Sequence, residues 1–321
     1  MNTIKGIILI TSLIFFASCT FDYFEDETNY MIYAPKACAE LRTDDYRIED
    51  IHIYIYKEML EKQKTACFPF QENPRMKMGY FNFRLYPGSY LSYCFADTEG
   101  LSFNDVESYR SAVFGLPESD NGEYHYPGSL TEFSVNVINS EIEYPAPIKT
   151  DTVLFNKRYS GRICIAFEKL TDINPLLTYN NISSIKIEAT GVGTYQNLAL
   201  LTDSIHTRSG RYTPSDKVMM ECIPYENPLE GYLERYDFGI DGYFFPSLND
   251  EEEGSSITLW MDFIDHDGNS IHAFPLGVSE TLHMNQTIYI GTDGVSTVVL
   301  EIDGPEQWDP GIEHGDGGMG I

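Results

Sequence analysis

The sequence lacks the residue patterns that mark the common catalytic and cofactor sites. It has no G-x-S-x-G elbow and no HExxH pair. The stretch "GVGTYQ" from Gly191 lacks the third glycine of a dinucleotide-binding loop, so we expect a strand end or a turn there. No two cysteines form a CxxC, which argues against a zinc or redox motif. The sequence therefore names no catalytic group, metal ligand or cofactor, and we predict that the protein is not an enzyme.

Basic residues are scarce. Lys and Arg total 21 against 49 Asp and Glu, and the formal net charge is −28. Residues 1–18 contain one Lys and no acid, so their removal changes the charge to −28 − 1 = −29. A surface this acidic repels phosphate backbones, and we expect no nucleic-acid partner.

Long hydrophobic runs are missing as well. The most apolar run, residues 7–17, has about eleven residues, whereas a membrane-spanning helix needs roughly 20. With Lys5 before it, this run has the form of the apolar part of a secretory signal. We therefore predict a signal peptide over residues 1–18.

A cysteine and then several acids follow this signal. Phe16-Ala17-Ser18 before Cys19 resembles a bacterial lipobox, in which cleavage exposes the cysteine and its thiol takes a diacylglycerol. Several acyl chains, palmitate among them, would anchor the chain stably. The acids within residues 22–27 resemble the surface-export signal of Bacteroidetes lipoproteins. We predict lipidation of Cys19, a lipidated acidic linker over residues 19–29, and a surface-exposed protein anchored in the cell outer membrane. The alternative is an ordinary secretory signal with an incidental cysteine.

Helix signals are few, and the rest of the chain has the period-two pattern of strands. Ile51, Ile53 and Ile55 alternate with His52, Tyr54 and Tyr56, and similar segments recur up to Ile302. One helix is predicted to start with Asn104 as its N-cap and with Glu107, three residues later, completing a capping box.

Many short strands separated by turn residues indicate an all-β fold built of β-sandwiches. The proline-bearing stretch at residues 144–147 is the predicted domain boundary. It divides the chain into an N-terminal β-sandwich over residues 30–147 and a C-terminal β-sandwich over residues 148–303. The Gly-rich, acidic residues 304–321 are predicted to form a flexible tail.

Two other features of the sequence are a possible calcium loop and the remaining cysteines. The stretch "DFIDHDGNSIHAF" places Asp265, Asp267 and Asn269 at alternate positions, but positions six and twelve of a calcium loop hold Ser270 and Leu276. A hairpin turn at Asp267-Gly268 is therefore expected in place of a metal site. Five cysteines remain after Cys19, and five cannot all pair internally, so no disulfide is predicted.

Several segments together resemble the FimB-type family of fimbrial anchor and minor-subunit lipoproteins of Bacteroidia. Besides the lipobox, these are "IEDIHIYIYKE", "FNFRLYPGSYLSYCFAD", "DTVLFNKRYSGRICIAFEKL" and "NQTIYIGTDGVSTVVLEIDGPEQW", which span residues 45–310 in order. The resemblance implies two tandem transthyretin-like β-sandwich domains and a role at one end of a pilus, as its lipid-held base or as an accessory subunit. The implied partner is a fimbrial subunit (fimbrillin).

The residues alone are compatible with this role, because an aromatic, strand-rich protein can donate or accept a strand at an open sheet edge. The competing interpretation is a surface glycan-binding lipoprotein of a polysaccharide-uptake system. Asp151-Thr152-Val153 and Asp203-Ser204-Ile205 also resemble the O-glycosylation motif of exported Bacteroidetes proteins, which makes Thr152 and Ser204 candidate sites. Chance occurrence of so short a motif explains them equally well.

Overall fold

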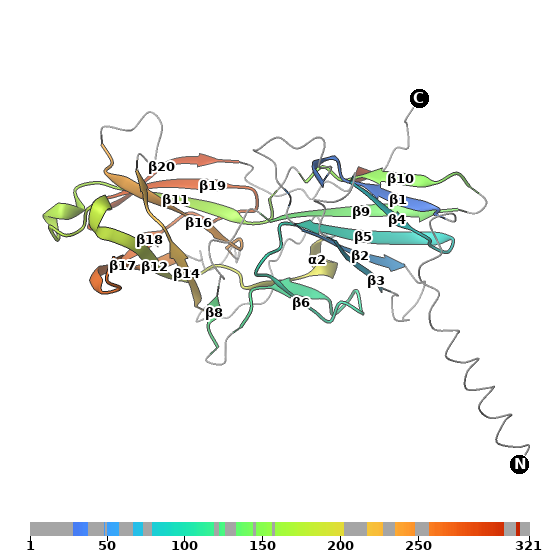
Figure 1. Ribbon diagram of the computed structural model, residues 1–321, viewed down its shortest axis with the longest axis horizontal. Coiled ribbons are helices and arrows are strands. Elements are labelled where there is room, and N and C mark those ends of the chain that lie inside the picture. The colour runs from blue at the N-terminus through green and yellow to red at the C-terminus, as the bar shows by residue number, and fades with distance from the viewer. Residues whose placement is uncertain are drawn as a thin grey trace, which may run out of the picture.

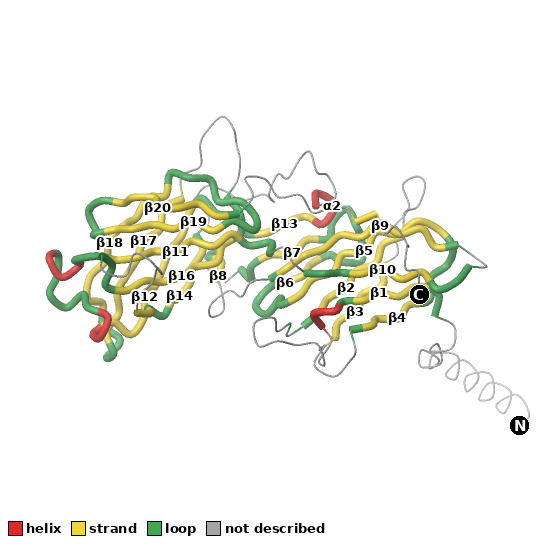
Figure 2. Tube along the Cα trace, turned by 90° about the horizontal axis from the view of Figure 1, so that it is seen from above, coloured by secondary structure: helices red, strands yellow, loops and turns green. Residues whose placement is uncertain are grey.

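The computed structural model describes residues 28–37, 48, 50–57, 67–72, 79–118, 122–125, 133–143, 146–155, 158–201, 217–226, 235–247, 257–304 and 313–314. Within these ranges the protein is almost entirely β, with five open sheets, a four-residue α-helix and a few 3-10 turns. The predicted all-β sandwich fold is confirmed. The elements form two lobes side by side along the long axis (Figures 1 and 2). No helix in the described ranges is long and apolar enough to cross a membrane.

The N-terminal lobe has three layers. Its middle layer is a five-stranded sheet in the order β21 (Glu313–His314), β9 (Ser134–Ile142), β5 (Gly88–Ala96), β2 (Ile51–Lys57) and β3 (Cys67–Glu72). One outer layer consists of β10 (Lys149–Thr152), β1 (Tyr30–Tyr33) and β4 (Tyr80–Phe83). The other consists of β13 (Tyr195–Asn197), β7 (Val113–Gly115) and β6 (Ser102–Asn104).

Strand β2 shows why three layers form. Ile51, Ile53 and Ile55 are buried in a cluster with residues of β1 and β4. Tyr54 and Tyr56 lie on the opposite face and are buried in a second cluster with Phe114 of β7 and its neighbours. The predicted alternation is therefore confirmed, and because both of its faces are apolar, the sheet needs a cover on each side.

The C-terminal lobe is a sandwich of two five-stranded sheets. One runs β15 (Tyr225–Glu226), β16 (Phe238–Phe244), β11 (Gly161–Phe167), β19 (Thr287–Thr292) and β20 (Thr297–Asp303). The other runs β18 (Ser270–Val278), β17 (Ile257–Asp265), β12 (Ile182–Thr190), β14 (Val218–Cys222) and β8 (Tyr124–His125). Apolar residues of both sheets belong to one buried cluster, which fills the space between them.

The two lobes share strands. Strand β8 comes from the N-terminal part of the chain and pairs with β14 in the C-terminal lobe, with Tyr124 opposite Val218. Strand β13 comes from the C-terminal part and pairs with β7, with Tyr195 opposite Gly115. The short helix α2 (Leu198–Leu201) follows β13 directly. Each lobe therefore contains a strand supplied by the other half of the sequence.

Aromatic side chains fill the junction between the lobes. The ring of Phe114 lies 4.9 Å from that of Tyr159 and 6.1 Å from that of Phe133, measured between centroids. Phe245 of the second lobe approaches Tyr159 to 5.3 Å and Phe133 to 5.6 Å. One hydrophobic cluster thus continues from the first lobe into the second.

The predicted domain boundary falls next to a strand of the first lobe. Strand β10 pairs in parallel with β1, with Lys149 opposite Tyr30. Val153 and Phe155 are buried in the same cluster as Ile32 of β1. Since residues up to Phe155 pack in the first lobe, we propose that the two lobes divide after Phe155 and not after residue 147.

The predicted helix after Asn104 is wrong. Residues 105–111 form successive turns, and Asp105 has a φ of 53°, which no residue inside a right-handed helix adopts. Tyr109 still reaches the core, because its ring lies 5.8 Å from Tyr56 and 6.2 Å from Tyr93. Successive turns, and not a helix, therefore bring the side chains of Val106 and Tyr109 against the core.

Candidate functional site

Of the three residues predicted for modification, the structure describes Thr152 alone. Cys19 and Ser204 lie outside the described residues. Thr152 lies on β10 with an exposed side chain, directly after the buried Asp151. Its accessibility is compatible with modification, which remains a prediction.

Asp151 belongs to a buried polar cluster that joins two sheets. The Ser140 hydroxyl on β9 donates a hydrogen bond to the Asp151 carboxylate on β10. The Tyr30 hydroxyl lies 3.2 Å from Ser140 Oγ and 3.5 Å from Ser92 Oγ. Lys149 Nζ approaches Asp151 Oδ1 to 3.5 Å. Burial raises the pKa of the Tyr30 hydroxyl far above its usual value, so this group stays protonated.

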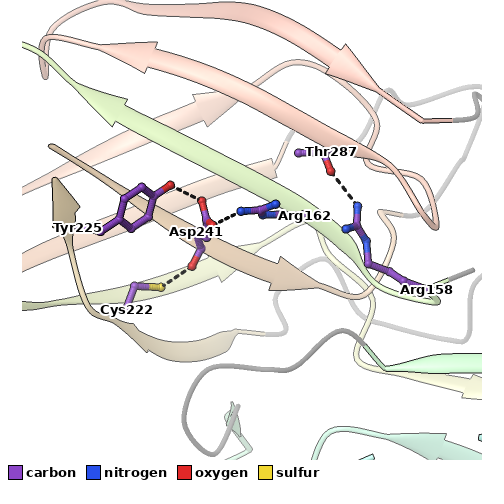
Figure 3. A network of polar contacts seen from close by, with 6 residues as sticks. All are labelled: Arg158, Arg162, Cys222, Tyr225, Asp241 and Thr287. Atoms are coloured by element: carbon purple, nitrogen blue, oxygen red, sulfur yellow. Dashed lines mark hydrogen bonds and ion pairs between the residues drawn. The ribbon is translucent and has the colours of Figure 1, made fainter. Parts of the chain in front are cut away.

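A second polar cluster lies on the sheet of β11 in the C-terminal lobe (Figure 3). Its centre is Asp241 on β16, whose carboxylate accepts hydrogen bonds from the Arg162 guanidinium and, at 2.6 Å, from the Tyr225 hydroxyl. The Cys222 thiol lies 3.3 Å from the backbone carbonyl oxygen of Asp241. Both carboxylate oxygens are thus occupied by partners within the protein.

Arg158 extends this cluster toward the junction of the lobes. Its Nη2 donates to the Gln286 carbonyl and to the Thr287 hydroxyl, both at 2.8 Å. The guanidinium groups of Arg158 and Arg162 lie 5.6 Å and 5.7 Å from the centroid of the Tyr243 ring, within cation–π range. Arg158 therefore attaches the segment between the lobes to the start of β19.

The polar groups of these two clusters hold neighbouring strands together. Burial raises the pKa of the Cys222 thiol to about 12 and raises those of Cys164 and Cys94 further. A thiol acts as a nucleophile or metal ligand in its deprotonated form, and these three buried, free cysteines stay protonated at neutral pH. In the described part of the chain, no group of three or more His, Cys, Asp or Glu side chains is arranged to hold a metal ion.

The acidic stretch around Asp265 forms the predicted hairpin. Strands β17 and β18 pair antiparallel on either side of it, and Gly268 takes the left-handed φ of 83° that the turn requires. Asp265 Oδ1 accepts the backbone N–H groups of Asp267 and Asn269 at 2.9 Å and 2.8 Å. The carboxylate that a metal would need thus stabilises its own turn.

Sequence reasoning did not find either polar cluster. A weak signal existed for the second one, because "GRICIAF" and "FGIDGYFF" each carry a single charge in an apolar strand, and the two charges are opposite. Burying such a charge requires a partner. Nothing in the sequence indicates that Asp151, the third residue of the four-residue edge strand β10, lies next to Ser140.

Comparison with known proteins gives weak likenesses only. No family model matches the chain, and no curated protein matches it. A Bacteroides thetaiotaomicron structure provisionally named a polysaccharide-binding protein is 11% identical, covers 85% of this chain and 96% of its own, and has a TM-score of 0.47. A provisionally named adhesin of Bacteroides ovatus is 14% identical over 82% of this chain and 88% of its own, with a TM-score of 0.47.

The tip fimbrial protein Mfa3 of Porphyromonas gingivalis, truncated at its C-terminus, is 11% identical. It covers 85% of this chain and 98% of its own at a TM-score of 0.39. With TM-scores below 0.5, these likenesses decide nothing about the function of this chain. Membership of the FimB-type family stays a prediction from the sequence.

Proposed function

We propose that this protein is a surface lipoprotein of the cell outer membrane that serves as an anchor or accessory subunit at one end of a fimbrium. The observation that supports the proposal is that, among the described residues, the five sheets are open and end in edge strands, the kind of element to which another strand can be added. Lipidation at Cys19 would hold such a subunit at the cell. The segment-by-segment resemblance to FimB-type lipoproteins supports the same role.

Strand exchange suits this architecture for a physical reason. A strand laid along a sheet edge forms several backbone hydrogen bonds at once, each contributing roughly 0.5–1.5 kcal/mol net. Little of that contact depends on surface charge, so it persists in moderate salt. Between two acidic partners, added salt weakens the repulsion that remains.

Deletion of the gene tests the role. If the protein is an end subunit, the deletion strain should make fimbrillin but shed it, or assemble abnormally long or incomplete fimbriae, as seen by electron microscopy. Normal cell-attached fimbriae would contradict the proposal.

The anchor is tested separately by Cys19→Ala. The variant should lose its acyl group and its detergent partitioning, and it should be released or kept as precursor. Unchanged membrane retention of this variant would contradict lipid attachment while leaving the fimbrial role open.

Glycan binding is the second candidate function, and one observation favours it. Trp260 on β17 is 47% exposed, and a solvent-facing indole is a typical stacking surface for a sugar ring. The test is retention on a polysaccharide affinity gel with Trp260→Ala as the comparison. Retention that Trp260→Ala abolishes, together with a growth defect of the deletion strain on one glycan, would favour this alternative.

A further inference from the structure

The outer edge of β9 differs from the other sheet edges. On its inner side β9 pairs with β5 over all nine residues without a shift in register. On its outer side Ser134 bridges to Arg158, and Ile138 and Asn139 pair in parallel with β21. No other residue of β9 is paired on that side within the described ranges. Among the described residues, most of this nine-residue strand therefore has no partner along its outer edge.

The other long edges carry features that hinder strand addition. Strand β20 has an extra residue, Leu300, where its register with β19 shifts, and it carries Glu301 and Asp303. Strand β18 has Pro275 in its middle, and its register with β17 shifts at Ile271. Bulges, charges and prolines on an edge are known obstacles to pairing with another chain.

The remaining edge strands are interrupted or short. Strand β3 contains Pro69, which cannot donate a backbone hydrogen bond. Strands β4 and β10 have four residues each, the strands of the small outer sheet have three, and β8 and β15 have two. Among the described edges, only β9 is long, free of proline and free of a register shift.

A buried acceptor on β9 adds a second, independent observation. The Asn136 side chain is 7% exposed, and its Oδ1 has no hydrogen-bond partner within the described part of the protein. Buried carboxamide oxygens are normally paired. A donor brought by a strand next to β9 would satisfy this acceptor, whereas the neighbouring Ser140 hydroxyl already donates to Asp151.

The present occupant of this edge is short. Strand β21 contributes two residues, and parallel pairing is slightly less stable per residue than antiparallel pairing. The residues that follow it in the sequence, "GDGGMGI", include four glycines, a residue type that is depleted in strands. A longer strand would form more backbone hydrogen bonds with β9 than β21 does.

We propose that the outer edge of β9 is the strand-accepting surface of this protein, and that its own C-terminal segment at Glu313–His314 occupies the edge until a longer strand displaces it. This inference rests on the proposed function for the identity of the displacing strand. The occupation of the edge by the tail does not depend on that function.

Hydrogen exchange on the full-length chain tests the occupation. The double variant Glu313→Pro/His314→Pro removes the backbone N–H groups of β21 and should detach this strand from β9. Backbone amides along a strand point alternately to its two edges, so the outward-facing amide of Asn139 should lose its slow exchange, whereas the amides of β9 that face β5 should keep theirs. The matched control, Gly317→Pro/Gly318→Pro, places the same two prolines further along the sequence than β21 (Glu313–His314) and should exchange like the wild type. Near-ultraviolet circular dichroism checks that both variants stay folded.

A peptide supplied separately tests the acceptor itself. The synthetic peptide of residues 310–318 should restore slow exchange in β9 of the Glu313→Pro/His314→Pro chain. The same peptide with prolines at positions 313 and 314 should not restore it. Equal exchange of β9 in the two double variants, or no protection by the unmodified peptide, would overturn the inference.

The two proposals fail separately. If exchange behaves as expected while the gene-deletion strain keeps normal fimbriae, the edge assignment stands and the fimbrial role falls. If β9 exchange is the same in all variants while the deletion strain sheds fimbrillin, the role stands and the docking edge lies elsewhere.

Discussion

At the scale of single residues, the pairing of Arg162 with Asp241 is the contact whose removal we expect to cost most. The two side chains are 29% and 23% exposed, and Arg162 Nε is buried with no hydrogen-bond partner in the described structure. The interaction with Asp241 raises the pKa of Arg162 despite the opposing effect of its burial. The guanidinium therefore stays charged and depends on this carboxylate.

Asp241→Asn removes the negative charge and keeps the shape. It should lower the free energy of unfolding by about 1–3 kcal/mol, since a partly buried charged hydrogen bond is lost. Urea denaturation measures this loss. The control is Glu188→Gln, which breaks the pair with Lys217, whose side chain is 46% exposed, and should change the midpoint much less. Equal effects of the two substitutions would contradict the importance assigned to the Asp241 cluster.

Thr152 yields the other prediction at this scale. If the Asp-Thr-Val motif is used in the native host, the intact mass of the mature protein should exceed that of lipid plus polypeptide, and Thr152→Ala should lower the excess. The exposed position of Thr152 on β10 makes it reachable by a transferase. A mass equal to lipid plus bare polypeptide would rule out modification at both Thr152 and Ser204.

At the scale of elements, the close contact between β7 and β13 makes Gly115 sensitive to substitution. A Cβ at Gly115 would lie 2.5 Å from the Cβ of Tyr195 and 2.7 Å from the carbonyl oxygen of Thr194. These atoms belong to the backbone or directly adjoin it, so they cannot move aside without shifting the strand.

Gly115→Ala should therefore lower the free energy of unfolding by about 1–3 kcal/mol, the usual cost of overpacking. The matched control is Gly277→Ala on β18, where an added Cβ meets nothing within 4 Å. Thermal or urea unfolding of the pair measures the difference. A Gly115→Ala protein as stable as Gly277→Ala would show that the contact between β7 and β13 is loose.

The strands could be predicted from the sequence much better than their partners could. The alternation in "IHIYIYK" identified β2 and both of its faces correctly. Pro87-Gly88, a typical turn pair, lies between β4 and β5 in the sequence, yet β4 pairs with β1 while β5 pairs with β2 and β9. The alternation of apolar and polar residues shows which face of a strand is buried, but it carries no information on which sheet the strand joins. The edge of β9 was hidden for the same reason.

At the scale of the whole molecule, the shared strands and the aromatic junction predict a single unfolding transition. Separating the lobes would break the β7–β13 and β8–β14 pairings and expose the rings of Phe114, Phe133 and Phe245. In differential scanning calorimetry the van't Hoff and calorimetric enthalpies should therefore agree. Two resolved transitions would contradict this coupling and indicate lobes that unfold independently.

The exchange of strands between the lobes also constrains the order in which the chain can fold as it is synthesised. The N-terminal half emerges first. The outer layer that contains β7 is incomplete until β13 follows, and β8 cannot pair with β14 until β14 follows. An early fragment would expose apolar surface and unpaired edges, which are the sources of aggregation. If the protein is exported as proposed, the chain has to remain unfolded, or be held by a chaperone, until both halves have crossed the inner membrane.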